Sequence, residues 1–404
     1  MTATPLHAVL LENIHPAGEE ALRGFGFSVE RHGNALSRQA LREALGRADV
    51  VGIRSKTRLD AELLAAAPRL LTVGCFCIGT DQVDLRTAGR RGVAVFNAPF
   101  SNTRSVAELT IAEIIALARR LGDKSAALHA GAWDKSAAGA HEVRGRTLGI
   151  VGYGHIGSQV SVLAEALGLR VQYYDIAPKL PMGNAVARAS LEDLLASSDI
   201  VSIHVPATPL TENLVGRDEL ALMRPGAHLI NNARGSVVDL DALADALRSG
   251  HISGAAVDVF PSEPEESKGA FTCPLAGLPN VLLTPHIGGS TEEAQESIAR
   301  DVIAKLVRFI RNGSTTTAVN VPEVDLPLVR AEQHRILHFH HNVPGVLGRM
   351  HTMLAQLGVN INAEFLQSSG DLSYVILDVD PSSGESVKQG LDTVPETIRV
   401  RTLW

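Results

Sequence analysis

The fold of this chain is decided by the stretch Thr147-Leu148-Gly149-Ile150-Val151-Gly152-Tyr153-Gly154-His155-Ile156-Gly157. An apolar run ends at a glycine, and the glycines that follow have the spacing G-x-G-x-x-G. After Gly157 the apolar residues recur at helical spacing, and a second apolar run then ends at Asp175. This order predicts a strand, a tight turn, a helix and a second strand, which is the βαβ unit that binds dinucleotides.

Each glycine of the pattern has a physical role. Gly152 permits the tight turn, Gly154 lets the backbone approach a pyrophosphate, and Gly157 lets the helix pack closely against the strand. The helix N-terminus offers unpaired N–H groups and the positive end of the helix dipole to the phosphates. Asp175 can accept hydrogen bonds from the ribose hydroxyls and would repel a 2′-phosphate. We therefore predict NAD, rather than NADP, as the cofactor.

The composition is typical of a large globular protein. The chain has 404 residues, a length at which two or three domains are expected. The net charge of −7 gives no reason to expect a nucleic acid as a partner. No apolar run is long enough to span a bilayer, and no secretory signal is visible. Because Cys75, Cys77 and Cys273 form neither a zinc pattern nor a disulfide framework, we expect a cytoplasmic protein without a bound metal.

The first hundred residues alternate between apolar runs and helical patterns, which predicts a parallel sheet flanked by helices. One buried strand covers 49–53, and Arg54-Ser55-Lys56-Thr57-Arg58 follows it directly. Open parallel sheets bind ligands at this end of their strands. Three cations so close together favour an anionic ligand, since a guanidinium suits a phosphate or a carboxylate. The alternative is a solvated loop, which is the usual fate of a run of charges.

Further βα units follow the glycine loop, and three of their strands end close to a residue that can do chemistry. The predicted strands are 227–232 before Arg234, 255–260 before Glu263, and 281–284 before His286. Because the carboxyl ends of parallel strands lie at one edge of a sheet, we expect these three side chains to converge beside the glycine loop. Each of them could instead be an ordinary surface or turn residue.

A long helix is predicted between the first group of units and the glycine loop. It covers 105–121, and Asn102 precedes it, so the Asn102 side chain could cap the helix or meet the substrate. Trp133 lies in a polar Ala- and Gly-rich stretch over 131–139. A large aromatic residue there is either a local core plug or an anchor in another subunit, and the sequence leaves both alternatives open.

The three residues at the strand ends fit one reaction. When NAD accepts a hydride, the substrate alcohol must lose a proton, and a histidine such as His286 is the natural base near neutral pH. Glu263 would hold the other ring nitrogen and fix the tautomer, and Arg234 would hold a substrate carboxylate. Together these residues predict the oxidation of a 2-hydroxy acid, or the reverse reduction of a 2-oxo acid.

Several segments resemble the D-2-hydroxyacid dehydrogenases, and the resemblance covers nearly the whole chain. They are Gly152–Gly157, Asn232–Gly235, Asp258–Pro264 and Thr284–Thr291. The segment Phe96–Ser105 is similar to the branch of this family that acts on 3-phosphoglycerate. The resemblance implies NAD-dependent oxidation of 3-phospho-D-glycerate to 3-phosphohydroxypyruvate, the first step of L-serine biosynthesis. Two alternatives stay open, a dehydrogenase or reductase of another 2-hydroxy acid such as 2-hydroxyglutarate, and an NAD-sensing protein that acts by binding partners.

The residue roles known in the family fall on matching positions of this sequence. The resemblance implies that Arg234 holds the substrate carboxylate, His286 is the acid and base, and Glu263 supports it. Arg54 matches a residue that meets the substrate phosphate, and Lys135 matches a segment that in some members reaches a neighbouring subunit. The expected substrate contacts are Arg54, Ser55, Asn102, Lys135 and Arg234. The expected cofactor contacts are Gly152, Gly154, His155, Ile156, Gly157, Asp175, Asn232, Ala233, Arg234, Asp258, His286, Ile287, Gly288 and Gly289.

The last part of the chain is predicted to be a separate small domain. A Pro-rich segment over 319–327 is predicted to be a linker, and the elements after it have the order βαββαβ of a ferredoxin-like fold. The turn His340–Leu347 and the segment Gly358–Asn360 resemble an ACT domain, a regulatory module of amino-acid pathways. In the family this module pairs across subunits and binds serine as an inhibitor. The resemblance therefore implies L-serine as an effector and a homo-oligomer, expected to be a tetramer. The matching effector-binding residues are His340, Asn342 and Asn360. The alternative is a structural or dimerising module.

The chain departs from related bacterial enzymes at a few positions. It has Gly33 where they have lysine, His334-Arg335 where they have two arginines, and Val343 where they have an arginine. These differences bear on the phosphate clamp and on the transmission of inhibition.

In all, we predict an α/β chain with three domains. A flavodoxin-like substrate-binding domain covers 1–101 and 289–330, a Rossmann dinucleotide-binding domain covers 102–288, and a ferredoxin-like ACT domain covers 331–404.

Overall fold

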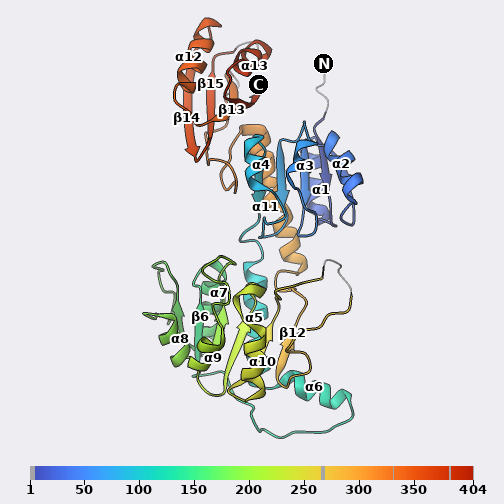
Figure 1. Ribbon diagram of the computed structural model, residues 1–404, viewed down its shortest axis with the longest axis vertical. Coiled ribbons are helices and arrows are strands. Elements are labelled where there is room, and N and C mark those ends of the chain that lie inside the picture. Colours follow the sequence, from blue (N-terminus) through green and yellow to red (C-terminus); the bar gives the residue numbers. More distant parts are fainter. Residues whose placement is uncertain (1–4, 265–268, 331, 382–383, 404) are drawn as a thin grey trace. The chain divides into compact units, whose positions relative to one another are not determined.

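The computed structural model describes residues 5–264, 269–330, 332–381 and 384–403 (Figure 1). It divides into two compact units. One consists of Met1–Ser101 with Gln295–Trp404, and the other is Asn102–Ala294. Within the described ranges, no helix is both long and apolar enough to cross a membrane.

The first unit contains a parallel sheet with the strand order β2-β1-β3-β4-β5, which is the flavodoxin-like order. Its strands are β1 (His7–Leu10), β2 (Ser28–Arg31), β3 (Val50–Ile53), β4 (Thr72–Cys75) and β5 (Ala94–Asn97). Its helices are α1 (Pro16–Gly24), α2 (Arg38–Arg47), α3 (Ala61–Ala65), α4 (Leu85–Arg90) and α11 (Glu292–Asn312). Ser37, Asp60 and Asp84 cap the N-termini of α2, α3 and α4 with their side chains. Two apolar cores cover the two faces of the sheet.

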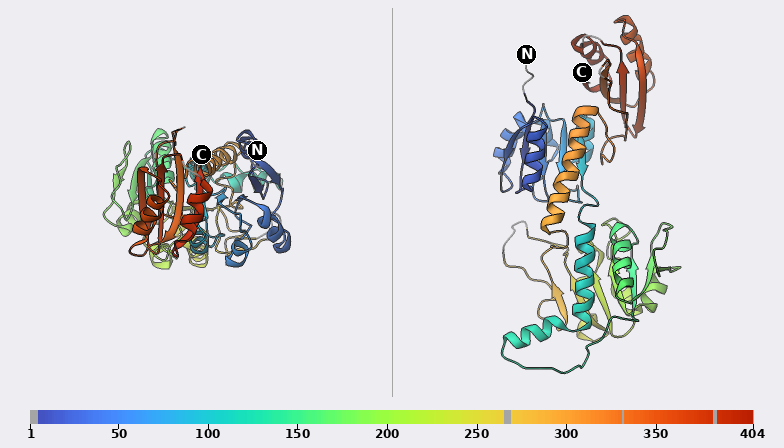
Figure 2. Two further views of the ribbon diagram at one scale, coloured as in Figure 1. Left: turned by 90° about the horizontal axis from the view of Figure 1, so that it is seen from above. Right: turned by 180° about the vertical axis from the view of Figure 1, so that it is seen from behind.

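The 21-residue helix α11 is not among the elements expected from the sequence. Its apolar side chains Ile298, Val302 and Leu306 recur every four residues and pack into the core under the first sheet. Figure 2 shows this helix, in orange, running along that sheet. The charged residues between the apolar positions mark the solvent face, which is the pattern of an amphipathic helix.

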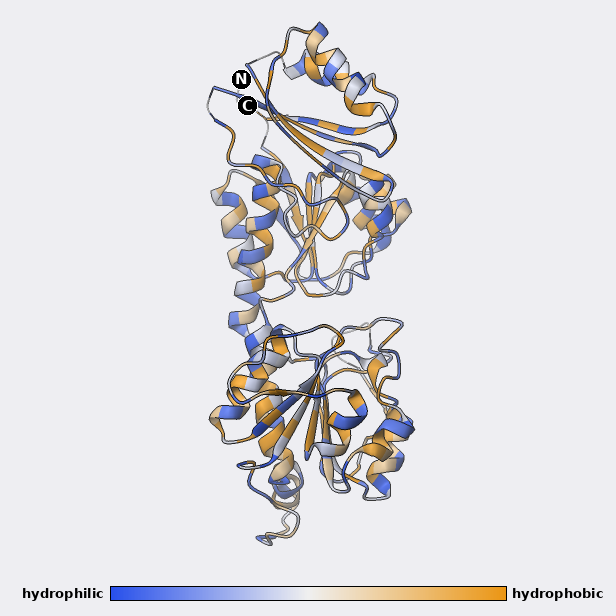
Figure 3. Cartoon of the chain, turned by 90° about the vertical axis from the view of Figure 1, so that its left-hand side faces the viewer, coloured by the Kyte–Doolittle hydropathy of each residue, from blue (hydrophilic) through white to orange (hydrophobic). Residues whose placement is uncertain are grey.

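The second unit contains a parallel sheet with the order β12-β11-β10-β9-β6-β7-β8, which is the Rossmann order extended by one strand. Its strands are β6 (Thr147–Val151), β7 (Arg170–Tyr174), β8 (Val186–Ala187), β9 (Ile200–Ile203), β10 (Ala227–Asn231), β11 (Ile252–Val257) and β12 (Val281–Leu283). Its helices are α5 (Thr103–Ala118), α6 (Leu121–His129), α7 (His155–Ala166), α8 (Leu191–Ser197), α9 (Arg217–Leu222) and α10 (Leu240–Arg248). The strands of both parallel sheets are largely hydrophobic, as the orange colour in Figure 3 shows, because helices cover their faces.

The helix predicted over 105–121 is interrupted. Arg120 has a φ of 51°, which ends one helix at Ala118 and lets another begin at Leu121. Asn102 stands at the N-cap of the first of these helices, but its side chain makes no capping hydrogen bond, so the capping alternative is wrong. Trp133 is 79% exposed, so the alternative of a local core plug is wrong, and an anchor in another subunit stays a prediction.

The C-terminal part of the first unit is an antiparallel sheet with the order β14-β15-β13-β16. It contains β13 (His334–His341), α12 (Val346–Gln356), β14 (Ile361–Ser369), β15 (Leu372–Val379), α13 (Gly384–Asp392) and β16 (Thr397–Leu403), which confirms the βαββαβ order. One face of the sheet packs with the two helices. The other face contributes Leu337, Phe339 and Tyr374 to the core that contains α11.

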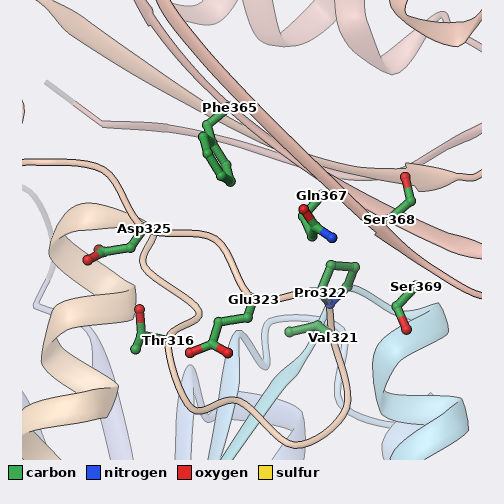
Figure 4. Close-up of a pocket in the computed structure, with 9 residues that line it drawn as sticks. All are labelled: Thr316, Val321, Pro322, Glu323, Asp325, Phe365, Gln367, Ser368 and Ser369. Carbon is green, nitrogen blue, oxygen red and sulfur yellow. The ribbon is translucent and has the colours of Figure 1, made fainter.

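The segment predicted as a linker is packed against the first sheet. Asn320 accepts a hydrogen bond from Val95 N at 2.8 Å and donates one to Val93 O at 2.9 Å. Val321 and Val324 are buried in the same core as α11. An open pocket of about 620 Å³ lies between this segment and β14 (Figure 4). The segment is therefore a fixed part of the first unit and not a free tether.

Candidate active site

The glycine loop joins β6 to α7, and its geometry leaves room for a dinucleotide. Gly152 has a φ of 90°, and a Cβ there would lie 2.6 Å from the carbonyl oxygen of His204, so only glycine fits. A Cβ on Gly157 would lie 2.2 Å from the carbonyl oxygen of Gly152. A Cβ on Gly154, in contrast, would meet nothing within 4 Å. The loop is thus closed toward the sheet and open at Gly154, as the close approach of a pyrophosphate requires.

The residues around the loop also fit a bound NAD. The N-cap of α7 is Gly154, which has no side chain to cap the helix, and this suits a helix end that receives phosphates. Asp175 follows β7, and its carboxylate accepts hydrogen bonds from Tyr153 N and Ala177 N, both at 2.9 Å. These bonds hold the acid beside the loop, where a ribose hydroxyl would find it.

Glu263 and His286 come from loops after two neighbouring strands, β11 and β12. Glu263 Oε2 lies 2.8 Å from His286 Nδ1. The other oxygen of the carboxylate accepts a hydrogen bond from Phe260 N at 3.1 Å. A carboxylate only accepts hydrogen bonds, so the Nδ1 atom carries a proton and Nε2 is left to exchange one with a ligand. His286 can therefore accept a proton at Nε2 while the carboxylate of Glu263 holds its ring at Nδ1.

Asp258, which is 1% exposed, holds the turn that carries His286. Its carboxylate accepts hydrogen bonds from Ile287 N and Gly288 N at 2.8 Å, and from Thr284 Oγ1 at 2.6 Å. His286 has a φ of 54°. A non-glycine residue keeps such a conformation only when its surroundings enforce it. The backbone here is thus arranged to present the imidazole.

Arg234 follows β10, beside the loop that carries Glu263. A Cβ on Gly235 would lie 1.9 Å from the backbone of Phe260, so the two loops are in contact. The Arg234 guanidinium donates to Ala233 O at 2.7 Å. Among the described residues, no hydrogen bond joins Arg234 to Glu263 or His286. The structure therefore brings the three loops together and pairs two of the three side chains.

Glu113 on α5 was not expected at this site. Asn232, one of the expected cofactor contacts, donates to Glu113 Oε2 at 2.6 Å and to Thr110 Oγ1 at 3.1 Å. Burial raises the pKa of Glu113 to about 7, and the nearby Asp258 adds to this shift. The signal in the sequence was a single acid on the apolar stripe of a predicted helix. Asn232 Oδ1 is buried without a partner in the described structure, which is compatible with a ligand donor at this place.

The other expected substrate contacts are distributed over both units. Arg54 and Ser55 follow β3 in the first unit, with Arg54 half-buried and Ser55 exposed. Lys135 lies in an exposed irregular segment of the second unit. The amide of Asn102 lies beside Gly289, where an added Cβ would come within 2.2 Å of its Nδ2. Their roles toward a substrate stay predictions.

The expected effector residues lie at two opposite ends of the C-terminal sheet. His334, Val379 and Ile361 are aligned across the sheet at one end, and His341 and Leu372 at the other. Asn360 directly precedes the first end, whereas His340 and Asn342 belong to the second. An eight-residue strand is roughly 20 Å long or more, so these side chains do not form one site within a single chain.

A Rossmann sheet with an open glycine loop, and a His–Glu pair at its strand ends, define a nicotinamide-dependent dehydrogenase. Residues 111–288 match the family model of the D-isomer specific 2-hydroxyacid dehydrogenase NAD binding domain, and residues 336–399 match the AHAS small subunit-like ACT domain. These matches confirm the predicted class, its fold and its cofactor NAD.

Curated relatives give the family. D-3-phosphoglycerate dehydrogenase of Escherichia coli strain K12 is 50% identical over 399 residues, 98% of this chain and 97% of that protein. The enzyme of the same name from Dictyostelium discoideum is 48% identical over 396 residues, again 98% and 97% of the two chains. The chain belongs to the D-3-phosphoglycerate dehydrogenase family.

Solved structures agree with this assignment. The D-lactate dehydrogenase of Aquifex aeolicus, solved with NAD and lactic acid, is 30% identical with a TM-score of 0.65. The similarity covers 75% of this chain and 95% of that one. A protein of Thermus thermophilus is 36% identical with a TM-score of 0.69, covering 76% and 97% of the two chains.

Proposed function

We propose that this protein oxidises 3-phospho-D-glycerate to 3-phosphohydroxypyruvate with NAD, as the entry step to L-serine biosynthesis. The observation that carries the proposal is the contact of 2.8 Å between Glu263 and His286 at the edge of an NAD-binding sheet. It occurs in a chain that is 50% identical, over nearly its whole length, to D-3-phosphoglycerate dehydrogenase of Escherichia coli.

Each residue of the proposed site has a distinct task. His286 Nε2 takes the proton of the substrate hydroxyl group, while Glu263 holds Nδ1 and stabilises the imidazolium that forms. Arg234 holds the substrate carboxylate, and Arg54 holds the phosphate, because a guanidinium can donate two parallel hydrogen bonds to either group. NAD, when bound, supplies the hydride acceptor.

The C-terminal domain is proposed to bind L-serine as a feedback inhibitor, in a homotetramer located in the cytoplasm. Because Asn342 and Asn360 lie at opposite ends of one sheet, a site that uses both needs two copies of the domain. This geometry supports an oligomer with an effector site between chains. Cys75, Cys77 and Cys273 form no disulfide among the described residues, which is compatible with a reducing compartment.

The test of the proposed reaction is NADH formation with a panel of substrates. We expect 3-phosphoglycerate to give a higher kcat/KM than 2-hydroxyglutarate, lactate and glycerate. No preference for the phosphorylated acid would refute the assignment and favour another 2-hydroxy acid. A purified protein that binds NAD but turns over none of them would point instead to an NAD-sensing protein.

Regulation is tested by a titration of L-serine into the same assay, followed by Asn342→Ala and Asn360→Ala. Serine should inhibit the parent protein, and either substitution should weaken the inhibition without changing turnover in its absence. If serine has no effect on the parent protein, the proposed effector is wrong.

A further inference from the structure

Glu12 is a buried acid at the carboxyl end of β1. It is only 7% exposed, and its φ of 62° lies in the left-handed region that residues other than glycine rarely adopt. Strand β1 pairs with β3, so the chain that follows β1 lies beside the loop that follows β3. A buried carboxylate needs polar partners, since its desolvation is otherwise costly.

Its partners are three backbone N–H groups of that one loop. Arg54 N at 3.2 Å and Thr57 N at 2.8 Å donate to Glu12 Oε1, and Lys56 N at 3.0 Å donates to Oε2. Backbone N–H groups that converge in this way form a concavity that binds anions. Here the anion is a side chain of the protein itself. The loop cannot change its conformation without leaving a buried carboxylate unpartnered, which is strongly unfavourable.

The backbone of Arg54 is also held at its carbonyl group. Gln82 Nε2 donates to Arg54 O at 2.7 Å and to Gly79 O at 3.3 Å, which ties the loop after β3 to the loop after β4. Within the described residues, the hydrogen bonds of Arg54 are those of its backbone. The backbone of Arg54 is thus fixed on both sides while its guanidinium is left for a ligand.

We propose that Glu12, together with Gln82, is the positioning residue that presents the Arg54 guanidinium to the anionic end of the substrate. The inference rests on the proposed role of Arg54 as a phosphate contact. The second unit uses the same construction, since the buried carboxylate of Asp258 takes N–H groups of the turn that carries His286. In both places a buried carboxylate fixes the conformation of a loop, and that conformation determines the position of the functional side chain.

The test compares the Michaelis constants of the full-length protein and its variants. Glu12→Gln keeps the size of the side chain but removes the charge and places an NH₂ group against N–H donors. We expect the KM for 3-phosphoglycerate to rise about tenfold or more, while kcat and the KM for NAD change less than about twofold. Gln82→Ala removes the carbonyl contact and should raise the same KM. It keeps the inference testable if Glu12→Gln does not fold.

Asp49→Asn is the matched control. Asp49 also has a buried carboxylate and is 5% exposed. It accepts a hydrogen bond from His7 N at 2.8 Å and forms a salt bridge with Arg69. It directly precedes β3 and therefore lies at the opposite edge of the same sheet. The control should lower the Tm as Glu12→Gln does, but it should leave the KM for 3-phosphoglycerate unchanged.

A double variant separates the possible outcomes. If Glu12 acts through Arg54, Glu12→Gln should add no further rise in KM to Arg54→Ala. Independent effects in the double variant, or an equal rise in KM with Asp49→Asn, would overturn the inference in favour of a general effect on stability. An unchanged KM in Arg54→Ala would refute the phosphate contact itself. A raised KM in Arg54→Ala with an unchanged KM in Glu12→Gln would refute only the role of Glu12.

Discussion

Replacing Glu263 by glutamine tests the proposed site most directly. The amide keeps the shape of the side chain and can still accept a hydrogen bond from His286 Nδ1, but it removes a negative charge 2.8 Å from the ring. This charge matters most when the imidazole takes up the substrate proton, because a carboxylate stabilises an imidazolium better than an amide does. The loss should therefore appear in kcat and not in the affinity for NAD.

The exposure of the pair sets the size of the effect. The side chains of His286 and Glu263 are 50% and 36% exposed, so water screens part of the charge. A hydrogen bond to a charged group contributes roughly 1.5–3 kcal/mol, and the screening favours the lower half of this range. A loss of about 1.5–2 kcal/mol corresponds to a kcat that is roughly 10- to 30-fold lower.

The assay is NADH formation at saturating substrate and cofactor, with the Kd for NAD measured separately by binding. Glu263→Ala should lose more than Glu263→Gln, because it removes the hydrogen-bond acceptor of His286 Nδ1 as well as the charge. Glu219→Gln is the control, since that carboxylate accepts a hydrogen bond from Gly216 N at the start of α9 and has no other hydrogen-bond partner among the described residues. A kcat of Glu263→Gln within about twofold of the parent value would refute the reasoning. So would a loss of NAD affinity as large as the loss of kcat.

Four further substitutions test other parts of the structure. Glu113→Gln should raise the free energy of unfolding, measured with urea, by up to about 3 kcal/mol near pH 8 and by little near pH 5. The reason is that the pKa of Glu113 is raised from 4.5 to about 7 in the folded state, so the parent protein loses stability as the pH rises from 4.5 to 7. Gly157→Ala should lower the Tm through its clash with the loop carbonyl, whereas Gly154→Ala should keep the Tm and weaken NAD binding in a titration. Arg335→Ala, which leaves a buried carboxylate unpaired, should lower the free energy of unfolding by about 3 kcal/mol or more in the same urea assay.

The sequence by itself determined the fold class, the cofactor and the family of this protein. Glycine spacing, apolar periodicity and the acid after the second strand are local patterns, and each is tied to backbone geometry within a single βαβ unit. Strand ends in a parallel sheet share one edge, so the neighbourhood of Arg234, Glu263 and His286 also followed from local patterns once the strands were recognised. The short contact between Glu263 and His286 depends on the shapes of two loops, which the patterns did not give.

Only the tertiary structure decided how these side chains are held. Glu12 and Glu113 look like ordinary acids in the sequence, and their importance arises from burial against loops far away along the chain. The register of the C-terminal sheet likewise separated Asn342 from Asn360, although the resemblance to an ACT domain implied that both bind the effector. The physical reason is that burial, register and long-range hydrogen bonds depend on which segments meet in space, and local periodicity carries no information about that.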